Sequence, residues 1–264
     1  MQTENPEVTP EALHSFYRPD GSVLGHLVID SSIGGVSGGG IRMVPEMFTA
    51  DLCHLARAMT LKYAFLKWPF GGAKAAILTH RDTMSPQERQ EIVRSFAERL
   101  APFRGRYLPG EDAGTDDEDL RLICRTAGLM RPRSARDSGY YTALTVRLCV
   151  EQVAAARKLS LNDCRVAIEG FGKVGGALAE QLAEIGCRIV AVSTDRGAVY
   201  DSEGLDVTRL LRERAAAGSD CVNRYDPSRR IAPADVPAVP GDFFVPCALS
   251  WSVSSANADR VQAR

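Results

Sequence analysis

Apolar residues recur at helical spacing between about Ala50 and Lys67. Residues three and four positions apart share one face of a helix, so this spacing predicts a helix whose apolar face packs against a core. Lys62 lies at the edge of that face, where a lysine either extends its amine to solvent or binds an anion. The residues that follow the spacing are Leu52, Leu55, Ala56, Met59, Tyr63 and Leu66.

Short apolar runs bounded by glycine predict strands. Residues 23–30 form one such run, and a glycine-rich turn is expected after it at 34–40. Another run begins at Lys74, two residues after the glycine pair Gly71 and Gly72. It predicts a strand that holds the amine of Lys74 in place.

Capping residues mark the start of two further helices. Ser85, Pro86 and Glu88 supply an N-cap, a first-turn proline and a capping-box glutamate. The acids at 116–119 complement the helix dipole where the next helix begins. Asp112 differs from these acids, because it precedes the helix in a loop flanked by glycines.

The stretch 130–137 contains proline and charge but no apolar period, so it predicts a linker. We expect one domain on each side, over residues 1–135 and 136–264. A long helix over about 142–158 opens the second domain. Strands are expected in that domain at 165–169, 188–193 and 243–246, with a small hairpin near 197–204.

Composition and net charge argue against nucleic acid or a membrane as a binding partner. Hydrophobic residues make up 45% of the chain and charged residues 25%, as in ordinary soluble proteins. The 32 basic and 33 acidic side chains give a net charge of -1, which leaves no field to gather nucleic acid or an anionic membrane. No stretch approaches the length of a membrane span. Small-molecule partners are therefore expected.

The cysteines and histidines indicate a compartment and argue against a metal site. The 7 cysteines are scattered and show no C-x-x-C spacing, which is typical of reduced thiols in a cytoplasm. The first residues lack the basic and apolar segments of a signal peptide. The 4 histidines are isolated and lack metal-ligand spacing, so no metal is expected.

Lys74 is a candidate catalytic base. An amine between a glycine pair and an apolar run would be partly desolvated, and desolvation lowers its pKa. The glycines would let the backbone approach a small substrate closely. The alternative interpretation of this short motif is a surface lysine after an ordinary turn.

A G-x-G-x-x-G sequence follows one predicted strand and opens a helix, which is the context of a dinucleotide-binding turn. Asp195, near the end of the next predicted strand, could bond a ribose hydroxyl, whereas Arg196 beside it leaves the choice between NAD and NADP open. The alternative is a domain of this fold that binds no nucleotide. The candidate cofactor-binding residues of the turn are Gly170, Phe171, Gly172, Lys173, Val174 and Gly175.

Five motifs stand in series along the chain, at 39–42, 55–62, 70–74, 111–115 and 170–175. Together they resemble those of the glutamate/leucine/phenylalanine/valine dehydrogenases, from about residue 20 to residue 264. The resemblance implies an α/β fold, in which an N-terminal substrate-binding and dimerisation domain precedes a Rossmann dinucleotide-binding domain. It implies reversible, NAD- or NADP-dependent oxidative deamination of an L-amino acid to the 2-oxo acid and ammonia, in a homo-oligomer, with chemistry between the domains.

The resemblance also implies roles for single residues. Lys74 matches the catalytic lysine that activates water, and Asp112 matches the aspartate that moves a proton to and from the amino nitrogen. Lys62 matches the lysine that binds the substrate α-carboxylate. Thr142 matches a threonine that faces the nicotinamide. Positions that line the substrate pocket are matched by Gly39, Gly40 and Met59.

The chain departs from the family pattern at two places. Gly38 stands where glutamate-specific members have a lysine for the side-chain carboxylate, so an apolar or aromatic amino acid is expected, as in the leucine/phenylalanine type. After 246–249 the family usually continues with Glu-Asn-Gln, whereas this chain has Ser-Trp-Ser. The second half of the dinucleotide fold is expected to be missing through C-terminal truncation. The alternative function is therefore a noncatalytic or regulatory component of an oligomer.

Overall fold

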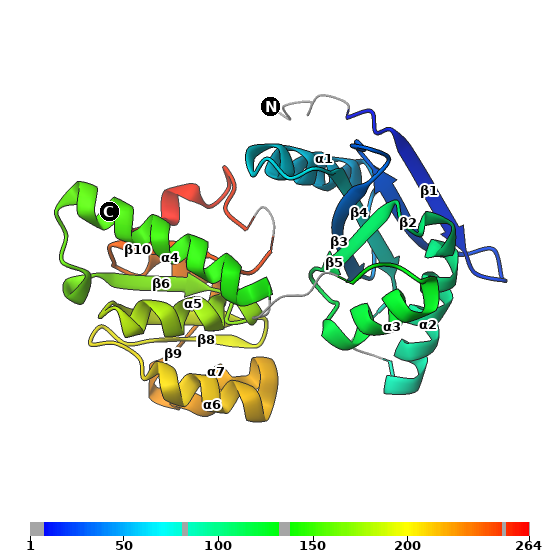
Figure 1. Cartoon of the computed structure of the whole chain (residues 1–264). Coiled ribbons are helices and arrows are strands. Elements are labelled where there is room, and N and C mark those ends of the chain that lie inside the picture. The colour runs from blue at the N-terminus through cyan, green and yellow to red at the C-terminus, as the bar shows by residue number, and fades with distance from the viewer. Residues whose placement is uncertain (1–7, 81–83, 132–137, 250–251, 264) are drawn as a thin grey trace. The chain divides into compact units, whose positions relative to one another are not determined.

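The computed structural model describes residues 8–80, 84–131, 138–249 and 252–263. The chain divides into two compact units, Met1–Arg133 and Ser134–Arg264, each with its own sheet (Figure 1). Most of the expected linker, residues 132–137, lies outside the described residues. So do Ser250 and Trp251, where the chain departs from the family pattern.

The first unit is built on a sheet of five strands in the order β1-β2-β4-β3-β5. Strand β3 runs parallel to β4 and to β5, whereas β2 is antiparallel to its neighbours β1 and β4. Gly40 of β3 pairs with Gly110 of β5, and Ile41 pairs with Ala75 of β4. This register brings the middle of β4 and the end of β5 to the two sides of Gly40. The strands are β1 (Ala12–Tyr17), β2 (Val23–Ile29), β3 (Ser37–Val44), β4 (Gly71–Leu78) and β5 (Tyr107–Glu111).

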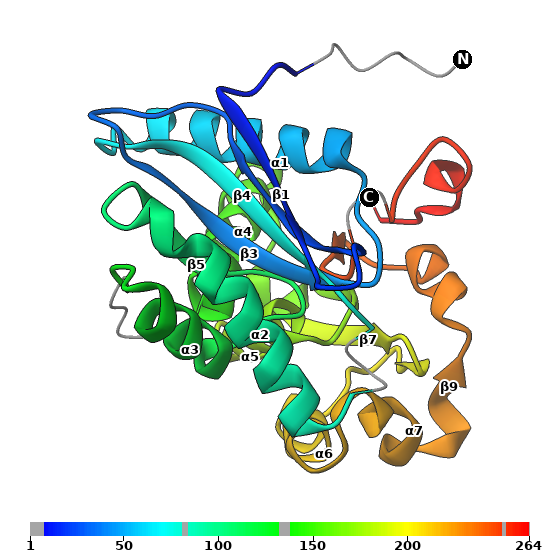
Figure 2. The same cartoon turned by 90° about the vertical axis from the view of Figure 1, so that its right-hand side faces the viewer.

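Helices cover both faces of this sheet. Figure 2 shows α1 (Thr49–Phe65) on one side, with α2 (Pro86–Leu100) and α3 (Asp117–Ala127) on the other. On β4, Ala73 and Ala75 belong to the core with α2 and α3, and Ala76 belongs to the core with α1. Because side chains alternate along a strand, the even-numbered residues of β4 project toward α1.

The second unit has a sheet in the order β10-β6-β7-β8-β9, in which β10, β6 and β7 are parallel and β8 and β9 are antiparallel. Its main core lies between the sheet and helices α4 to α7. The strands are β6 (Arg165–Glu169), β7 (Arg188–Thr194), β8 (Gly197–Tyr200), β9 (Arg230–Ile231) and β10 (Phe243–Pro246). The helices are α4 (Ser138–Arg157), α5 (Lys173–Glu184), α6 (Val207–Ala217) and α7 (Cys221–Tyr225).

Short 3-10 helices complete both units. The segment η6 (Pro233–Ala238) packs with the second core of the C-terminal unit through Val236. No helix within the described ranges is long and apolar enough to cross a membrane. The other 3-10 helices are η2 (Ala101–Phe103), η3 (Leu161–Asp163), η4 (Gly218–Asp220), η5 (Pro227–Arg229) and η7 (Ala258–Arg260).

The predicted α/β class is confirmed, and so are most predicted elements. The helix expected over 50–67 is α1, and the helix expected over 142–158 is α4. The Ser85 capping box is also confirmed, since the Ser85 hydroxyl accepts from the Glu88 N–H at 3.3 Å and the Glu88 carboxylate accepts from the Ser85 N–H at 2.7 Å. The strands expected at 23–30, 74–78, 165–169, 188–193 and 243–246 are all present.

The turn predicted at 34–40 is wrong in its second half, because β3 begins at Ser37. Glycine occurs in this strand because neighbouring backbone is close, and a Cβ on Gly39 would lie 1.6 Å from the Ala73 carbonyl oxygen. Strand β4 likewise begins at Gly71 rather than Lys74. Patterning also misses β1, β5 and β9.

Candidate active site

Lys74 is buried in β4, on the face of the sheet that α1 covers. Its side chain is 9% exposed, and its Nζ lies 2.7 Å from Oδ2 of Asp112, the residue after the end of β5. A Cβ on Gly40 would lie 3.3 Å from the Lys74 Nζ and 2.9 Å from the Asp112 Cβ. Glycine at position 40 therefore leaves the space in which the amine meets the carboxylate.

Arg42 is a third member of this cluster, and sequence reasoning missed it as a site residue. Its Nε donates to the same Asp112 Oδ2 at 2.9 Å. Among the described residues none donates to Asp112 Oδ1, so that oxygen can accept a hydrogen bond from a substrate. The available signal was the place of Arg42 at the end of the Gly-Gly-Ile-Arg motif, on the same strand face as Gly40.

Burial and charge shift the pKa values of this pair. Burial lowers the pKa of the Lys74 amine, the charges of Arg42 and Lys62 lower it further, and Asp112 opposes them. Burial alone would raise the pKa of Asp112, but Lys74 and Arg42 outweigh it and hold that pKa below its usual value. Asp112 is thus a carboxylate at neutral pH, and Lys74 releases its proton more readily than an exposed lysine. This combination suits acid–base chemistry.

The loop that carries Asp112 is held on two sides. The Thr115 hydroxyl donates to the Ile41 carbonyl at 2.7 Å and accepts from the Asp112 N–H at 3.0 Å. Arg89 of α2 donates to the Gly114 carbonyl at 3.2 Å. Gly114 itself has φ +85°, a conformation that favours glycine. The carboxylate is therefore positioned by fixed backbone rather than by a free loop.

The other expected substrate-side residues of this unit lie on α1 and β3. Lys62 is exposed near the end of α1, and its charge acts on the pKa of Lys74. Met59 is half-buried on the same helix. The Gly39 carbonyl accepts a hydrogen bond of 2.8 Å from the Tyr107 hydroxyl. The first unit thus combines two lysines, one carboxylate and a glycine-lined space.

Aromatic rings surround Gly38. The ring centroids of Tyr63 and Phe70 are 4.7 Å apart, and Trp68 stacks on Tyr63 at 5.4 Å. A Cβ on Gly38 would lie 3.3 Å from the Phe70 ring and 3.4 Å from the Tyr63 ring. The surroundings of this position are therefore apolar.

In the second unit, the three glycines of the dinucleotide-binding turn, Gly170, Gly172 and Gly175, differ in what an added Cβ would meet. Gly170 has φ +91°, and a Cβ on it would lie 2.8 Å from the Ala248 backbone. A Cβ on Gly175 would lie 1.8 Å from the Gly170 oxygen. Gly172 is the N-cap of α5, and within the described part of the chain no atom lies within 4 Å of where its Cβ would be. Open space before the helix N-terminus suits a phosphate.

The remaining predicted cofactor residues occupy varied places in this unit. Phe171 is buried in the core, and Lys173 and Val174 form the first turn of α5. Asp195 follows the end of β7, which is parallel to β6, and its carboxylate lies 3.7 Å from the Arg196 guanidinium. The exposed Thr142 hydroxyl donates to the Ser138 carbonyl at 2.9 Å within α4. The turn and Asp195 thus lie at the carboxyl ends of adjacent parallel strands, where this fold binds ligands.

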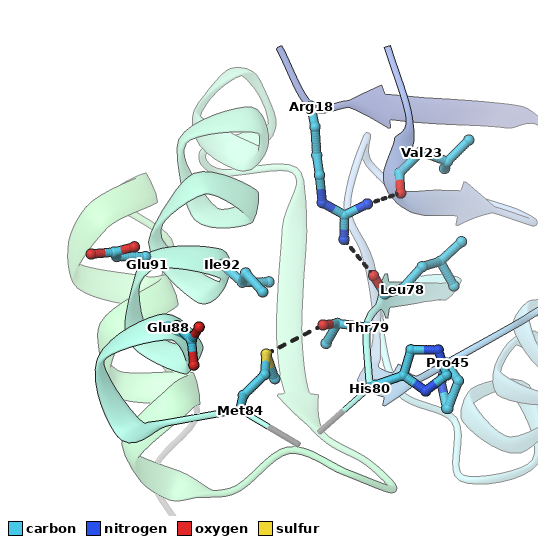
Figure 3. Close-up of a pocket in the computed structure, with 10 residues that line it drawn as sticks. All are labelled: Arg18, Val23, Pro45, Leu78, Thr79, His80, Met84, Glu88, Glu91 and Ile92. Atoms are coloured by element: carbon cyan, nitrogen blue, oxygen red, sulfur yellow. Dashed lines mark hydrogen bonds between the residues drawn. The ribbon is translucent and has the colours of Figure 1, made fainter. Parts of the chain in front are cut away.

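A separate pocket of about 590 Å³ lies in the first unit between α2 and the ends of the strands (Figure 3). Its one arginine, Arg18, donates to the carbonyls of Val23 and Leu78, so its donors already serve the fold. Neither Lys74 nor Asp112 lines this pocket. Among the residues described, no three His, Cys, Asp or Glu side chains gather as metal ligands.

Two family models match the chain. The model described as Glu/Leu/Phe/Val dehydrogenase, dimerisation domain, matches residues 16–128, and the model described as Glutamate/Leucine/Phenylalanine/Valine dehydrogenase matches residues 135–264. A glutamate dehydrogenase of Aeropyrum pernix is 28% identical over 98% of this chain and 66% of its own length. An NAD-specific glutamate dehydrogenase of Staphylococcus aureus is 28% identical over 87% of this chain and 58% of its own length. The chain thus spans 58% to 66% of these curated relatives.

Solved structures with the same fold come from several amino acid dehydrogenases. A hetero-hexameric glutamate dehydrogenase from Thermus thermophilus, in its leucine-bound form, has a TM-score of 0.83 at 30% identity, over 96% of this chain and 65% of that chain. An L-tryptophan dehydrogenase from Nostoc punctiforme has a TM-score of 0.57 at 22% identity, over 96% of this chain and 68% of that chain.

Proposed function

Because the chain belongs to the glutamate/leucine/phenylalanine/valine dehydrogenase family, we propose that it is an NAD(P)-dependent amino acid dehydrogenase. It oxidises an L-amino acid to the 2-oxo acid and ammonia, and it catalyses the reverse reaction. The observation that carries this proposal is the buried amine of Lys74 against the Asp112 carboxylate.

The chemistry follows from the charges of the cluster. Lys62 binds the substrate α-carboxylate, and Asp112 accepts a proton from the substrate amino group at Oδ1. Lys74, with its lowered pKa, takes a proton from the water that attacks the imine and stabilises the oxyanion that forms. Arg42 keeps Asp112 ionised and donates to Oδ2, which leaves Oδ1 for the substrate.

The residues of the second unit fit a nicotinamide dinucleotide. A bound nicotinamide would supply the acceptor for the hydride that leaves the substrate Cα. Gly170, Gly172 and Gly175 let the pyrophosphate reach the start of α5, and the N–H groups of that helix bind it. Asp195 bonds a ribose hydroxyl, and Arg196 beside it suits a 2′-phosphate, so the cofactor is NAD or NADP.

The proposed substrate is an apolar or aromatic amino acid, because Gly38 offers no cation and aromatic rings surround it. We expect Gly38→Lys to raise the activity with 2-oxoglutarate relative to that with a branched 2-oxo acid. The added Cβ requires only small movements of the Phe70 and Tyr63 rings. The ratio of kcat/KM for the two oxo acids measures the effect, with Gly110→Ala as control, since a Cβ there meets only the Gly40 Cα at 3.9 Å. An unchanged ratio would count against this pocket.

Removing Arg42 tests the electrostatics of the cluster. A lysine base works without its proton, so kcat/KM should rise with pH through the pKa of Lys74. The charge of Arg42 lowers that pKa and also the pKa of Asp112, so Arg42→Met raises both. The rising limb of the pH–rate profile should therefore move to higher pH. Arg121→Met, which removes an arginine whose side chain is 59% exposed on α3, should leave the limb in place.

We further propose a cytoplasmic homo-oligomer. All seven cysteines are free thiols, which supports a reducing compartment. The match of residues 16–128 to a dimerisation domain supports self-association. Analytical ultracentrifugation of the purified protein measures the oligomer directly, and a monomer at all concentrations would contradict this part.

Reductive amination tests the proposed activity. The purified protein is mixed with a branched, an aromatic or a short 2-oxo acid, ammonia and NADH or NADPH, and absorbance of the reduced nicotinamide is followed. We expect oxidation that depends on ammonia and on one class of oxo acid. Absence of turnover with every oxo acid would instead favour a noncatalytic component of an oligomer.

A further inference from the structure

Asp30 is a buried carboxylate that takes no part in the chemistry above. Its side chain is 1% exposed, and it follows the end of β2. Arg57 donates to its Oδ1 at 2.8 Å, and the Thr60 hydroxyl donates to its Oδ2 at 2.5 Å. Both donors lie on α1. A buried charge is costly to leave unpaired, so these bonds resist any movement of that helix away from the sheet.

The same network reaches the start of β4. The hydroxyls of Thr60 and Ser31 lie 2.9 Å apart, and the Ser31 hydroxyl accepts from the Gly72 N–H at 3.2 Å. The Asp30 N–H donates to the Gly72 carbonyl at 2.9 Å. A Cβ on Gly72 would lie 2.1 Å from the Thr60 nitrogen, so helix and strand are in close backbone contact. The network therefore joins α1, the end of β2 and the start of β4.

Each side of the network leads directly to a candidate site residue. Lys62 is two residues after Thr60 on α1, and Lys74 is two residues after Gly72 on β4. Gly72 and Lys74 share the strand face toward α1. Any shift of the helix along the strand would therefore change the separation of the two amines.

We propose that Asp30 is a positioning residue that, through Arg57 and Thr60, fixes α1 on β4 and thereby sets the distance between Lys62 and Lys74. The part that concerns substrate rests on the proposed function, because it takes Lys62 as the anchor of the substrate carboxylate. The claim that Asp30 fixes α1 on β4 depends only on the hydrogen bonds of Asp30, Thr60 and Ser31 described above.

Hydrogen exchange tests the helix part without any substrate. Asp30→Asn removes the charge at nearly constant shape, and Thr60→Val removes the hydroxyl. Asp51→Asn is the matched control, since Asp51 is an exposed acid in the first turn of α1. We expect amide exchange over residues 57–66 to speed up about tenfold in the first two variants, as for loss of one charged hydrogen bond. Unchanged exchange, or a uniform increase that includes α2 and α3, would overturn the proposal.

Kinetics test the substrate part. In Asp30→Asn, the KM for the 2-oxo acid should rise about tenfold, because Lys62 on the loosened helix binds the substrate carboxylate less well. The kcat should change less than about threefold, because Lys74 stays in place on β4. Asp51→Asn should leave both constants unchanged. Local loosening with an unchanged KM would overturn the link to Lys62. A wild-type protein without turnover would contradict the proposed function, while the exchange rates would still decide whether Asp30 fixes α1.

Discussion

Replacing Lys74 with alanine is expected to lower kcat/KM for reductive amination by about 10² to 10⁴, the contribution of a positioned acid–base group. The fold should be retained, because burial disfavours the charged amine and Asp112 keeps its bond to Arg42 after the substitution. Steady-state kinetics and thermal unfolding of the same preparations measure the two effects.

The control for this variant is Lys67→Asn. Lys67 is exposed just beyond α1 and has φ 55°, a conformation that asparagine tolerates. It should retain wild-type kinetics. If Lys74→Ala kept its activity, Lys74 would not be the base, and a loss only in proportion to unfolded protein would give it a structural role instead.

Asp112→Asn is expected to cause a comparable loss of turnover for a different reason. An amide cannot accept the proton of the substrate amino group, and it leaves the charges of Lys74 and Arg42 without a counter-ion. Because Asp112 raises the pKa of Lys74, its loss also lowers that pKa, so residual activity should extend to lower pH.

The kinetic control for Asp112→Asn is Asp117→Asn, at an acid whose side chain is 43% exposed in the first turn of α3. It removes the same charge from a neighbouring region of the first unit. A profile of kcat against pH for both variants separates the roles. Residual activity of Asp112→Asn within tenfold of the wild type would exclude a proton-transfer role.

The sequence predicts the parts of this site that depend on local chemistry. An apolar run after a glycine pair indicates a desolvated lysine, and the Lys74 side chain is indeed only 9% exposed. The strand–turn–helix context of Gly170 and Gly175 likewise follows from spacing, because Gly170 has a positive φ and a Cβ on either glycine would collide with neighbouring backbone. Capping residues likewise predict the start of α2, because the bonds of the capping box join Ser85 and Glu88, which are only three residues apart.

The features that the sequence does not predict depend on contacts between residues far apart along the chain. Gly38 and Gly40 resemble a turn in isolation, yet they lie in β3 because β4, β5 and α1 crowd them on both sides. The bond from Arg42 to Asp112 joins residues 70 positions apart, and no local pattern indicates it. Asp30 is similar, since its partners Arg57 and Thr60 lie on α1, 27 and 30 positions further along the chain, with β3 in between.

The proposed reaction moves the Cα hydrogen of an amino acid to the cofactor, and deuterium labelling follows that atom directly. The purified protein is incubated with NAD or NADP and an apolar L-amino acid that carries deuterium at Cα, and the reduced nicotinamide is analysed by mass spectrometry. We predict one deuterium in the nicotinamide and release of one ammonia per cofactor reduced, with steady-state turnover slowed by about 10² to 10⁴ in Lys74→Ala. Reduced cofactor without deuterium, or no reduction with any amino acid, would contradict the account.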